Sequence, residues 1–67
     1  MTKAEGRVIA YSDDVRAGYL MDSEGQKHFF SKKDWLDEDL PRSDQKIFFV
    51  MKGGRPQDIT ARKELDY

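Results

Sequence analysis

The short length of the chain, combined with the absence of cysteine, is the feature that most restricts its fold. The chain has 67 residues and no cysteine, so neither a disulfide framework nor a thiolate metal site reinforces it. A chain of this size buries only about 60% of the surface that it exposes when unfolded. The fold must therefore depend on one compact apolar core. We expect a single domain over residues 1–67, with its core within residues 6–62.

Five short segments have the composition of β-strands. The strands are expected at residues 7–11, 18–21, 27–30, 46–52 and 58–62. A polar cluster, residues 12–14, ends the first segment. Gly25 lies in a short connection between the second and third segments, which is typical of a β-hairpin. The fourth segment ends at Gly53-Gly54, where the missing Cβ atoms allow positive φ angles.

The connection between the third and fourth segments has helical character. Ser31 and Asp34 have the spacing of a helix-capping pair, which predicts a short helical turn that ends before Pro41. Five short strands with glycine turns, in so small a chain, predict an all-β fold. The expected architecture is a small five-stranded antiparallel barrel of the oligonucleotide/oligosaccharide-binding (OB) type. Curling the sheet into a barrel also protects strand edges that would otherwise pair with other chains.

Strand alternation then predicts which side chains face the core. Successive side chains of a strand point to opposite faces, so Phe29 and Phe30 cannot both enter the interior. The residues expected to point inward are Val8, Leu20, Phe29, Ile47, Phe49, Met51 and Ile59. Tyr19 and Phe30 are then expected to face outward on neighbouring strands. Trp35 is expected in the core or as a lid over one end of the barrel.

The charges are balanced in number but uneven in order. Twelve basic and thirteen acidic side chains give a net charge of −1, which argues against a protein that coats duplex nucleic acid by bulk electrostatics. The charged side chains of residues 27–33 are all basic, whereas those of residues 34–44 are acidic except for Arg42. Such a division is as typical of two solvated surfaces as of a functional basic patch. Both interpretations stay open.

Catalytic and metal chemistry have little basis in the sequence. There is no cysteine nucleophile, no serine beside a histidine–acid system, and no glycine-rich phosphate loop that leads into a helix. The single histidine, His28, does not form a metal site alone. We therefore expect a binding protein without cofactor or metal, and not an enzyme. No apolar run resembles a signal peptide or approaches the roughly 20 residues that span a bilayer, so a cytoplasmic location without membrane contact is expected.

Over residues 6–60 the chain resembles the bacterial cold-shock domain. The motifs that carry the resemblance are Gly6-x-Val8-x-x-Tyr11, Gly18-Tyr19-Leu20, Gly25, Phe29-Phe30, Gln45-Lys46-Ile47-Phe48-Phe49 and Gly53-Gly54-Arg55-Pro56-Gln57. Members of this family have an OB barrel that binds single-stranded RNA or DNA on a face with two ribonucleoprotein motifs. The resemblance implies the same fold and the same class of ligand here.

The resemblance also assigns positions on the binding face. In the first ribonucleoprotein motif, Y/F-x-F, Ala17 and Tyr19 occupy the two aromatic positions. In the second motif, V-F-V-H-F, Phe30 corresponds to the central stacking Phe, while Lys32 and Lys33 replace the His and the last Phe. Ala10 stands where the family has an exposed Trp. Three stacking rings are therefore absent, and two cations replace a ring pair.

The leading hypothesis is weak binding of single-stranded RNA or DNA with little sequence preference. Tyr19 and Phe30 would stack on bases, since rings hold bases and cations hold phosphates in such sites. The phosphate contacts are expected from Arg16, Lys32, Lys33 and Arg55, with His28 as a further contact. For each of these side chains the alternative is an ordinary solvated residue.

The alternative hypothesis keeps the barrel but assigns it to protein–protein contact, with reduced or lost binding of nucleic acid. Phe48 and Val50 are expected to face outward side by side, which is typical of a contact with another protein or with a second copy of the chain. The acidic residues 34–44 are the other candidate for this contact. Ala10 and Ala17 favour this alternative, whereas the basic run of residues 27–33 favours nucleic acid.

Overall fold

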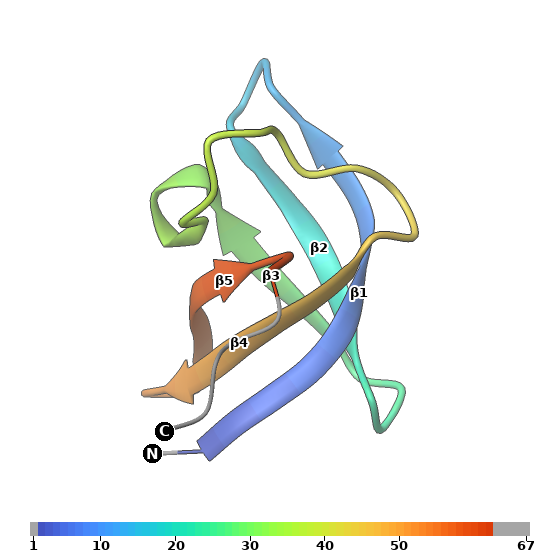
Figure 1. Ribbon diagram of the computed structural model, residues 1–67, viewed down its shortest axis with the longest axis vertical. Coiled ribbons are helices and arrows are strands. Elements are labelled where there is room, and N and C mark those ends of the chain that lie inside the picture. The colour runs from blue at the N-terminus through green and yellow to red at the C-terminus, as the bar shows by residue number, and fades with distance from the viewer. Residues whose placement is uncertain (1, 63–67) are drawn as a thin grey trace.

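The computed structural model describes residues 2–62, which form a strongly curved, five-stranded antiparallel sheet (Figure 1). The elements are β1 (Thr2–Ser12), β2 (Ala17–Asp22), β3 (Lys27–Ser31), a 3₁₀ turn η1 (Lys32–Asp34), β4 (Lys46–Lys52) and β5 (Arg55–Thr60). The order in the sheet is β3-β2-β1-β4-β5. The all-β fold with a helical turn between the third and fourth strands is confirmed.

The long first strand joins the two halves of the sheet. β1 pairs with β4 from Thr2 to Arg7 and with β2 from Gly6 to Ser12. A register shift between Val8 and Ala10 marks a β-bulge, and bulges bend and twist a strand locally. β1 therefore curves around the core (Figure 1). The sheet does not close by a ladder between β3 and β5, its two edges; instead Trp35 forms a parallel bridge with Ile59, and Leu36 N donates to Ile59 O at 2.8 Å.

The hairpin turns follow the glycines. Gly53 and Gly54 have φ angles of 58° and 79°, and positive φ at both central residues is the requirement of a type I′ hairpin turn. The strand that follows starts at Arg55, three residues before the predicted start at Asp58. Pro56 lies inside it, because β5 is an edge strand where a missing backbone donor is tolerated.

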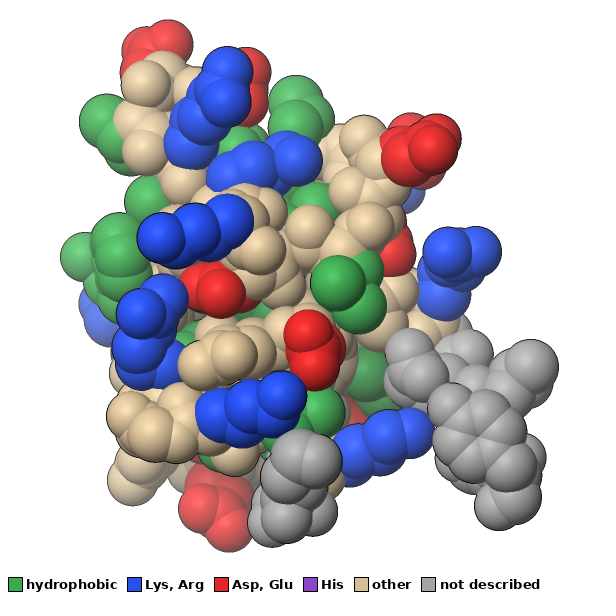
Figure 2. All heavy atoms as spheres, turned by 90° about the vertical axis from the view of Figure 1, so that its left-hand side faces the viewer, with side chains coloured by type: hydrophobic (Ala, Val, Ile, Leu, Met, Phe, Trp, Pro, Cys, Tyr) green, Lys and Arg blue, Asp and Glu red, His purple; other side chains and the backbone are tan. Residues whose placement is uncertain are grey.

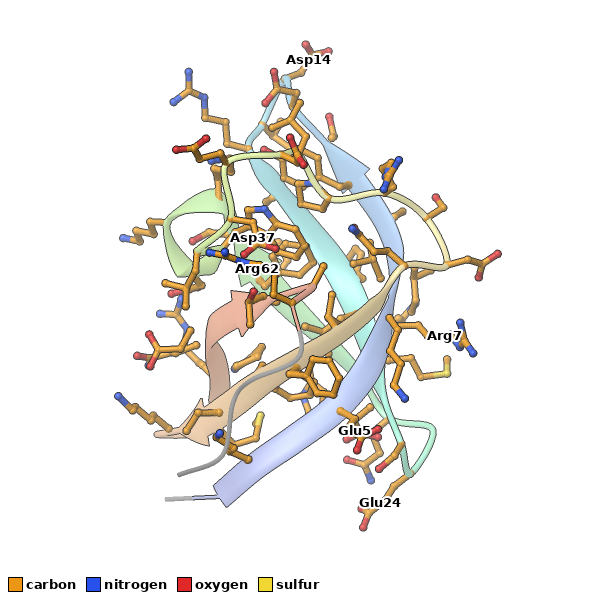
Figure 3. All side chains as sticks on the ribbon, viewed as in Figure 1. Glu5, Arg7, Asp14, Glu24, Asp37 and Arg62 are labelled. Carbon is orange, nitrogen blue, oxygen red and sulfur yellow. The ribbon has the colours of Figure 1, made fainter. Side chains whose placement is uncertain are left out.

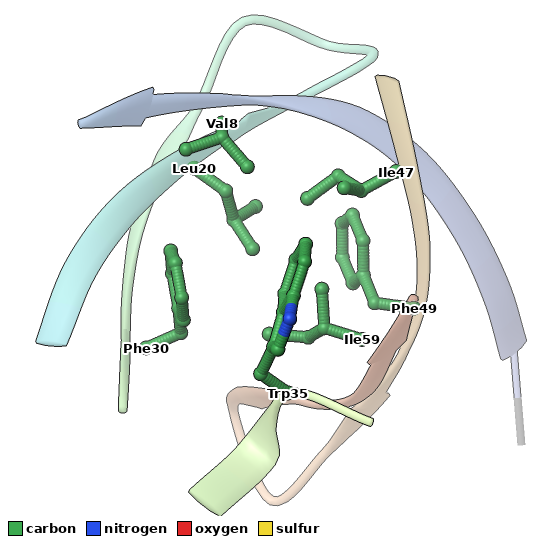
Figure 4. Packing of buried hydrophobic residues seen from close by; sticks show 7 residues of the cluster. All are labelled: Val8, Leu20, Phe30, Trp35, Ile47, Phe49 and Ile59. Atoms are coloured by element: carbon green, nitrogen blue, oxygen red, sulfur yellow. The ribbon is translucent and has the colours of Figure 1, made fainter. Parts of the chain in front are cut away.

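Seven buried apolar side chains form the core (Figure 4). They are Val8, Leu20, Phe30, Trp35, Ile47, Phe49 and Ile59. Trp35 is 5% exposed and its ring stacks on that of Phe30, with centroids 6.3 Å apart. The prediction of Trp35 as a core residue is confirmed. Its indole Nε1 donates to the Asp39 carbonyl oxygen at 2.7 Å, so the one polar atom of the ring is satisfied.

The predicted orientation of Phe29 and Phe30 is wrong. Phe30 is fully buried, whereas Phe29 is 55% exposed. In the β2–β3 ladder Tyr19 lies opposite Phe29, and Gly18 lies opposite Phe30. Residues directly opposite each other share a face of the sheet, so Phe29 faces outward with Tyr19. Phe30 instead enters the core beneath the buried Gly18 and contacts the ring of Tyr11 at 6.2 Å between centroids.

Candidate nucleic-acid interface

Tyr19 and Phe29 form an exposed aromatic pair on the outer side of β2 and β3. Their ring centroids are 5.7 Å apart and their planes meet at 73°, an edge-to-face contact. Both rings remain accessible, with 44% of Tyr19 and 55% of Phe29 exposed. The Lys27 ammonium lies 5.1 Å from the centroid of the Tyr19 ring, within the range of a cation–π contact. Two ring surfaces and a cation therefore meet at one place.

The aromatic pair belongs to a larger surface that we call the outer face. It consists of the outward-facing side chains Arg7, Ile9, Ala10, Tyr19, Met21, Lys27 and Phe29. The ladder registers place most of them in two rows across β1, β2 and β3: Arg7, Met21 and Lys27 in one row, and Ala10, Tyr19 and Phe29 in the next. None of these seven side chains is a carboxylate, so the charged groups on the outer face are cations.

Carboxylates lie beyond the ends of the outer face. Figure 3 shows Asp14 at the tip of the β1–β2 turn and Glu24 at the tip of the β2–β3 turn, at opposite ends of the molecule. Glu5, two residues before Arg7 on β1, lies at the edge of the outer face, with its Oε1 3.4 Å from the Lys46 ammonium.

Three of the predicted phosphate-binding cations lie together at one flank of the outer face. Lys32 and Lys33 start η1 immediately after β3, and the Lys32 amide donates to the Arg16 carbonyl oxygen at 2.9 Å. This hydrogen bond brings the β1–β2 turn, which carries Arg16, next to the beginning of η1. Lys33 and Arg16 are exposed, and Lys32 is half-buried. The structure thus places Arg16, Lys32 and Lys33 together beside the end of β3. We call these three residues the basic flank.

Arg55 does not join the basic flank as a free cation. Its Nη2 lies 3.0 Å from Asp34 Oδ2. The same carboxylate oxygen accepts the Ser31 amide at 3.4 Å and the Ser31 hydroxyl at 3.3 Å. Asp34 therefore connects β5 to the start of η1 through Arg55, and the guanidinium already has an anionic partner.

His28 lies on the opposite side of β3 from Phe29, so it does not belong to the outer face. Its Nε2 is 2.9 Å from Asp22 Oδ2, and both side chains are less than one-fifth exposed. Asp22 Oδ1 also accepts the amides of Glu24 and Gln26 at 2.9 Å each. The hydrogen bond from His28, followed by that from the Gln26 amide, lowers the pKa of Asp22 below its usual value. His28, predicted as a nucleic-acid contact, therefore binds the carboxylate that also holds the amides of the β2–β3 turn.

The two residues predicted as a protein interface are only half accessible. Phe48 and Val50 are partly buried on β4. The Lys46 ammonium lies 5.7 Å from the centroid of the Phe48 ring.

One residue of the acidic segment that follows η1, Asp37, has a structural role. Asp37 accepts the buried Thr60 hydroxyl at 2.6 Å and the Ala61 amide at 2.8 Å. Arg62 lies 4.0 Å from the same carboxylate, as Figure 3 illustrates. Seen from the side of η1 and β5, basic and acidic side chains are interspersed over the surface (Figure 2).

Phe29, Lys27, Met21, Ile9 and Arg7 are site residues that the sequence reasoning missed. The signal that places Phe29 beside Tyr19 is the length of the β2–β3 connection. Met21 pairs with Lys27, and the Asp22 amide donates to the Gln26 carbonyl oxygen at 2.9 Å. A connection one residue shorter would place Tyr19 opposite Phe30. The orientation of the whole strand thus depends on one residue in the turn.

Comparisons with known proteins identify no relative. No protein-family model, no curated protein and no solved structure matches the chain. Within residues 2–62 no three acidic or histidine side chains converge as a metal site. That part of the chain also contains no helix long and apolar enough to cross a membrane.

Proposed function

We propose that the chain binds single-stranded RNA or DNA on its outer face, with bases stacked on Tyr19 and Phe29. The observation that carries this proposal is the exposed aromatic pair with Lys27 beside it, on a surface whose charged groups are cations. Proteins that bind single strands combine aromatic platforms with cations along the backbone. The basic flank of Arg16, Lys32 and Lys33 supplies phosphate contacts at one end, and Lys27 supplies one beside the rings.

The same features favour a weak ligand interaction with little base preference. Every base has a π-face, so stacking tolerates any sequence. The outer face offers two rings for stacking. The net charge of the chain is −1, so long-range attraction for a polyanion is small. We expect dissociation constants in the micromolar range or weaker, which rise with salt concentration because cations on the protein displace counterions.

The resemblance to cold-shock domains supports the same assignment. Phe30, which the resemblance assigns to the central aromatic position of V-F-V-H-F, enters the core. With Phe29 at that position instead, both ribonucleoprotein motifs contribute a ring to one surface, and the motif's His and last Phe fall on Ser31 and Lys32. Ala10 and Ala17 occupy family positions that carry further rings. Ala10 lies directly opposite Tyr19, so its small side chain shortens the aromatic row and fits the expectation of weak binding.

Titration of a fluorescently labelled seven-nucleotide strand at low salt tests the proposal. Each base–aromatic stack contributes about 1–3 kcal/mol, so Tyr19→Ala/Phe29→Ala is expected to weaken binding by about 100-fold. Leu36→Ala, an exposed apolar residue outside the outer face, is the matched control and should bind as wild type does. Ala10→Phe extends the aromatic row and should strengthen binding. Equal affinity of wild type and the double variant, or no saturable binding by wild type, contradicts the proposal.

A second candidate function is contact with another protein or a second copy of the chain. Leu36 and Leu40 are 57% and 45% exposed beside the acidic residues that follow η1, and Phe48 and Val50 are half accessible on β4. Exposed apolar side chains of this kind are a basis for protein contacts. Sedimentation of wild type, Leu36→Lys and Phe48→Lys over a range of concentrations tests it. Self-association that either variant abolishes supports this function, whereas a monomer at every concentration excludes the homodimer.

A further inference from the structure

A groove continues the outer face across β1. It has a volume of about 520 Å³, within the range of roughly 300–1,000 Å³ that small-molecule sites occupy. Its apolar lining includes Ile9 and Met21, which are 37% and 40% exposed and also belong to the outer face. The groove therefore begins where the aromatic pair ends. Its rim carries polar groups from β1, β4 and the segment before β4, namely Glu5, Arg7, Asp44 and Lys46.

We propose that this groove is a third nucleotide subsite that holds the base next to those stacked on Tyr19 and Phe29. The inference rests on the proposed function and names a subsite of the same ligand. Met21 is two residues from Tyr19 on the same side of β2, a separation of roughly 7 Å. A base that leaves the aromatic pair along this direction meets the apolar surface of Met21 and Ile9, so the strand reaches the groove without crossing another surface.

The charges of the rim indicate that the groove binds a base and not a phosphate. The Lys46 ammonium lies 3.4 Å from Glu5 Oε1, and Arg7 Nη1 donates to the Asp44 carbonyl oxygen at 3.1 Å. Figure 3 shows Glu5 and Arg7 on the same stretch of β1. Asp22, which also lines the groove, is bound to His28 and to two turn amides. The cations of the rim thus have partners, and its carboxylates offset them.

A neutral heteroaromatic ring suits such a lining. The apolar surface of Ile9 and Met21 receives the face of the base, and thioethers make favourable contacts with aromatic rings. The guanidinium of Arg7 keeps further N–H donors beyond the one that binds Asp44, and the rim carboxylates accept hydrogen bonds from N–H groups of bases. The hydrogen-bond acceptors and the hydrogen-bond donors at the edge of a base therefore both find partners in the groove.

A length series with an abasic control tests the subsite. Wild type and Ile9→Thr/Met21→Gln are titrated with strands of two, three and four thymidines, and with a three-nucleotide strand whose base is missing at one end or the other. Wild type is expected to gain about five- to tenfold in affinity from two to three nucleotides. One of the two abasic strands should lose this gain, and in the variant the ratio of trinucleotide to dinucleotide affinity should fall by the same factor. Thermal unfolding confirms that the variant is folded.

The outcomes separate the subsite from the aromatic site. If both abasic strands keep the higher affinity of the trinucleotide, the protein binds the third phosphate and not the third base. This result overturns the base subsite. An equal loss of dinucleotide and trinucleotide binding in the variant means that Ile9 and Met21 support the aromatic pair only, and this also overturns it. If dinucleotide binding depends on Tyr19 and Phe29 but the third nucleotide adds no affinity, the subsite is overturned and the proposed function is retained. No binding of any strand by wild type overturns both.

Discussion

The outer face of β1–β3 and the corner formed by η1, residues 35–40 and β5 differ in how their charged side chains are engaged. In the corner two carboxylates already have hydrogen-bond partners. Asp34 binds Arg55 and Ser31, and Asp37 binds Thr60 and the Ala61 amide. On the outer face Lys27 lies over the exposed Tyr19 ring, which meets the Phe29 ring edge to face. The outer face is therefore available to a ligand, because its cation and its rings are not held by carboxylates.

This difference has an energetic reason. The sheet does not close by a β3–β5 ladder, so the corner must connect its two edges by other means, and buried hydrogen bonds to carboxylates are effective there. The outer face is already held by the ladders beneath it. Its side chains remain exposed and accessible to a ligand. Each of the following changes tests one side of this comparison.

The largest effect on stability is expected from the two adjacent phenylalanines of β3. Phe30→Ala removes a fully buried ring from the core and should lower the free energy of unfolding by about 3–5 kcal/mol, enough to unfold much of so small a domain. Phe29→Ala removes an exposed ring, and its cost should stay below about 1 kcal/mol. Urea denaturation followed by Trp35 fluorescence measures both. Equal losses would mean that the outer face contributes to the core.

Asp37→Ala tests the corner. It leaves the buried Thr60 hydroxyl and the Ala61 amide without their acceptor, and the expected cost is about 2–3 kcal/mol of unfolding free energy. Glu38→Ala, which changes an exposed neighbouring acid, is the control and should change stability by less than about 0.5 kcal/mol. Binding of single strands should be the same in both variants once they are folded. Weaker binding by folded Asp37→Ala would extend the interface to the corner.

The salt dependence of binding compares a cation from each region. For single strands the slope of log affinity against log salt changes by about 0.7 for each phosphate contact. Lys27→Gln is expected to reduce the slope by this amount, while Arg55→Gln leaves it nearly unchanged because Asp34 already holds the guanidinium. The measurement is a set of titrations between low and moderate salt. A larger change with Arg55→Gln would show that a phosphate replaces Asp34 as the partner of Arg55.

The smallest expected effect concerns the β2–β3 turn. The pKa of Asp22 is lowered in the folded protein, first by the hydrogen bond from His28, so ionised Asp22 stabilises the fold. This contribution is complete above the unfolded pKa, near 3.8, and is lost as the pH falls through the lower folded pKa. Wild type should therefore melt above Asp22→Asn at neutral pH, and the difference should shrink below about pH 4. A melting difference that is constant with pH would contradict this role of the carboxylate.

Much of the fold could be predicted because its signals are local. Glycine turns and β-rich segments placed β2, β3 and β4 within one residue of their observed bounds. β1 begins five residues before its predicted start, and β5 three residues before. The sequence also identified Tyr19 as an outward ring and Trp35 as a core residue. The sequence predicted ligand binding for Arg55 and His28. It could not indicate that they bind Asp34 and Asp22, because those contacts depend on tertiary structure and on the geometry of the turn. Nothing in the order of residues indicates that Arg55, 21 positions after Asp34, binds it.

By itself the sequence determined that five strands form around a single small core and that Phe29 and Phe30 point to opposite sides of their strand, because alternation is a property of the extended backbone. Only the tertiary structure decided which of the two rings faces water. That choice depends on the register of β3 against β2, which one residue in the turn fixes, and a shift by one residue exchanges the two faces of the whole strand. Likewise, the pairing that leaves Lys27 beside the rings and binds Arg55 to Asp34 exists only once the sheet has curved and its edges have met.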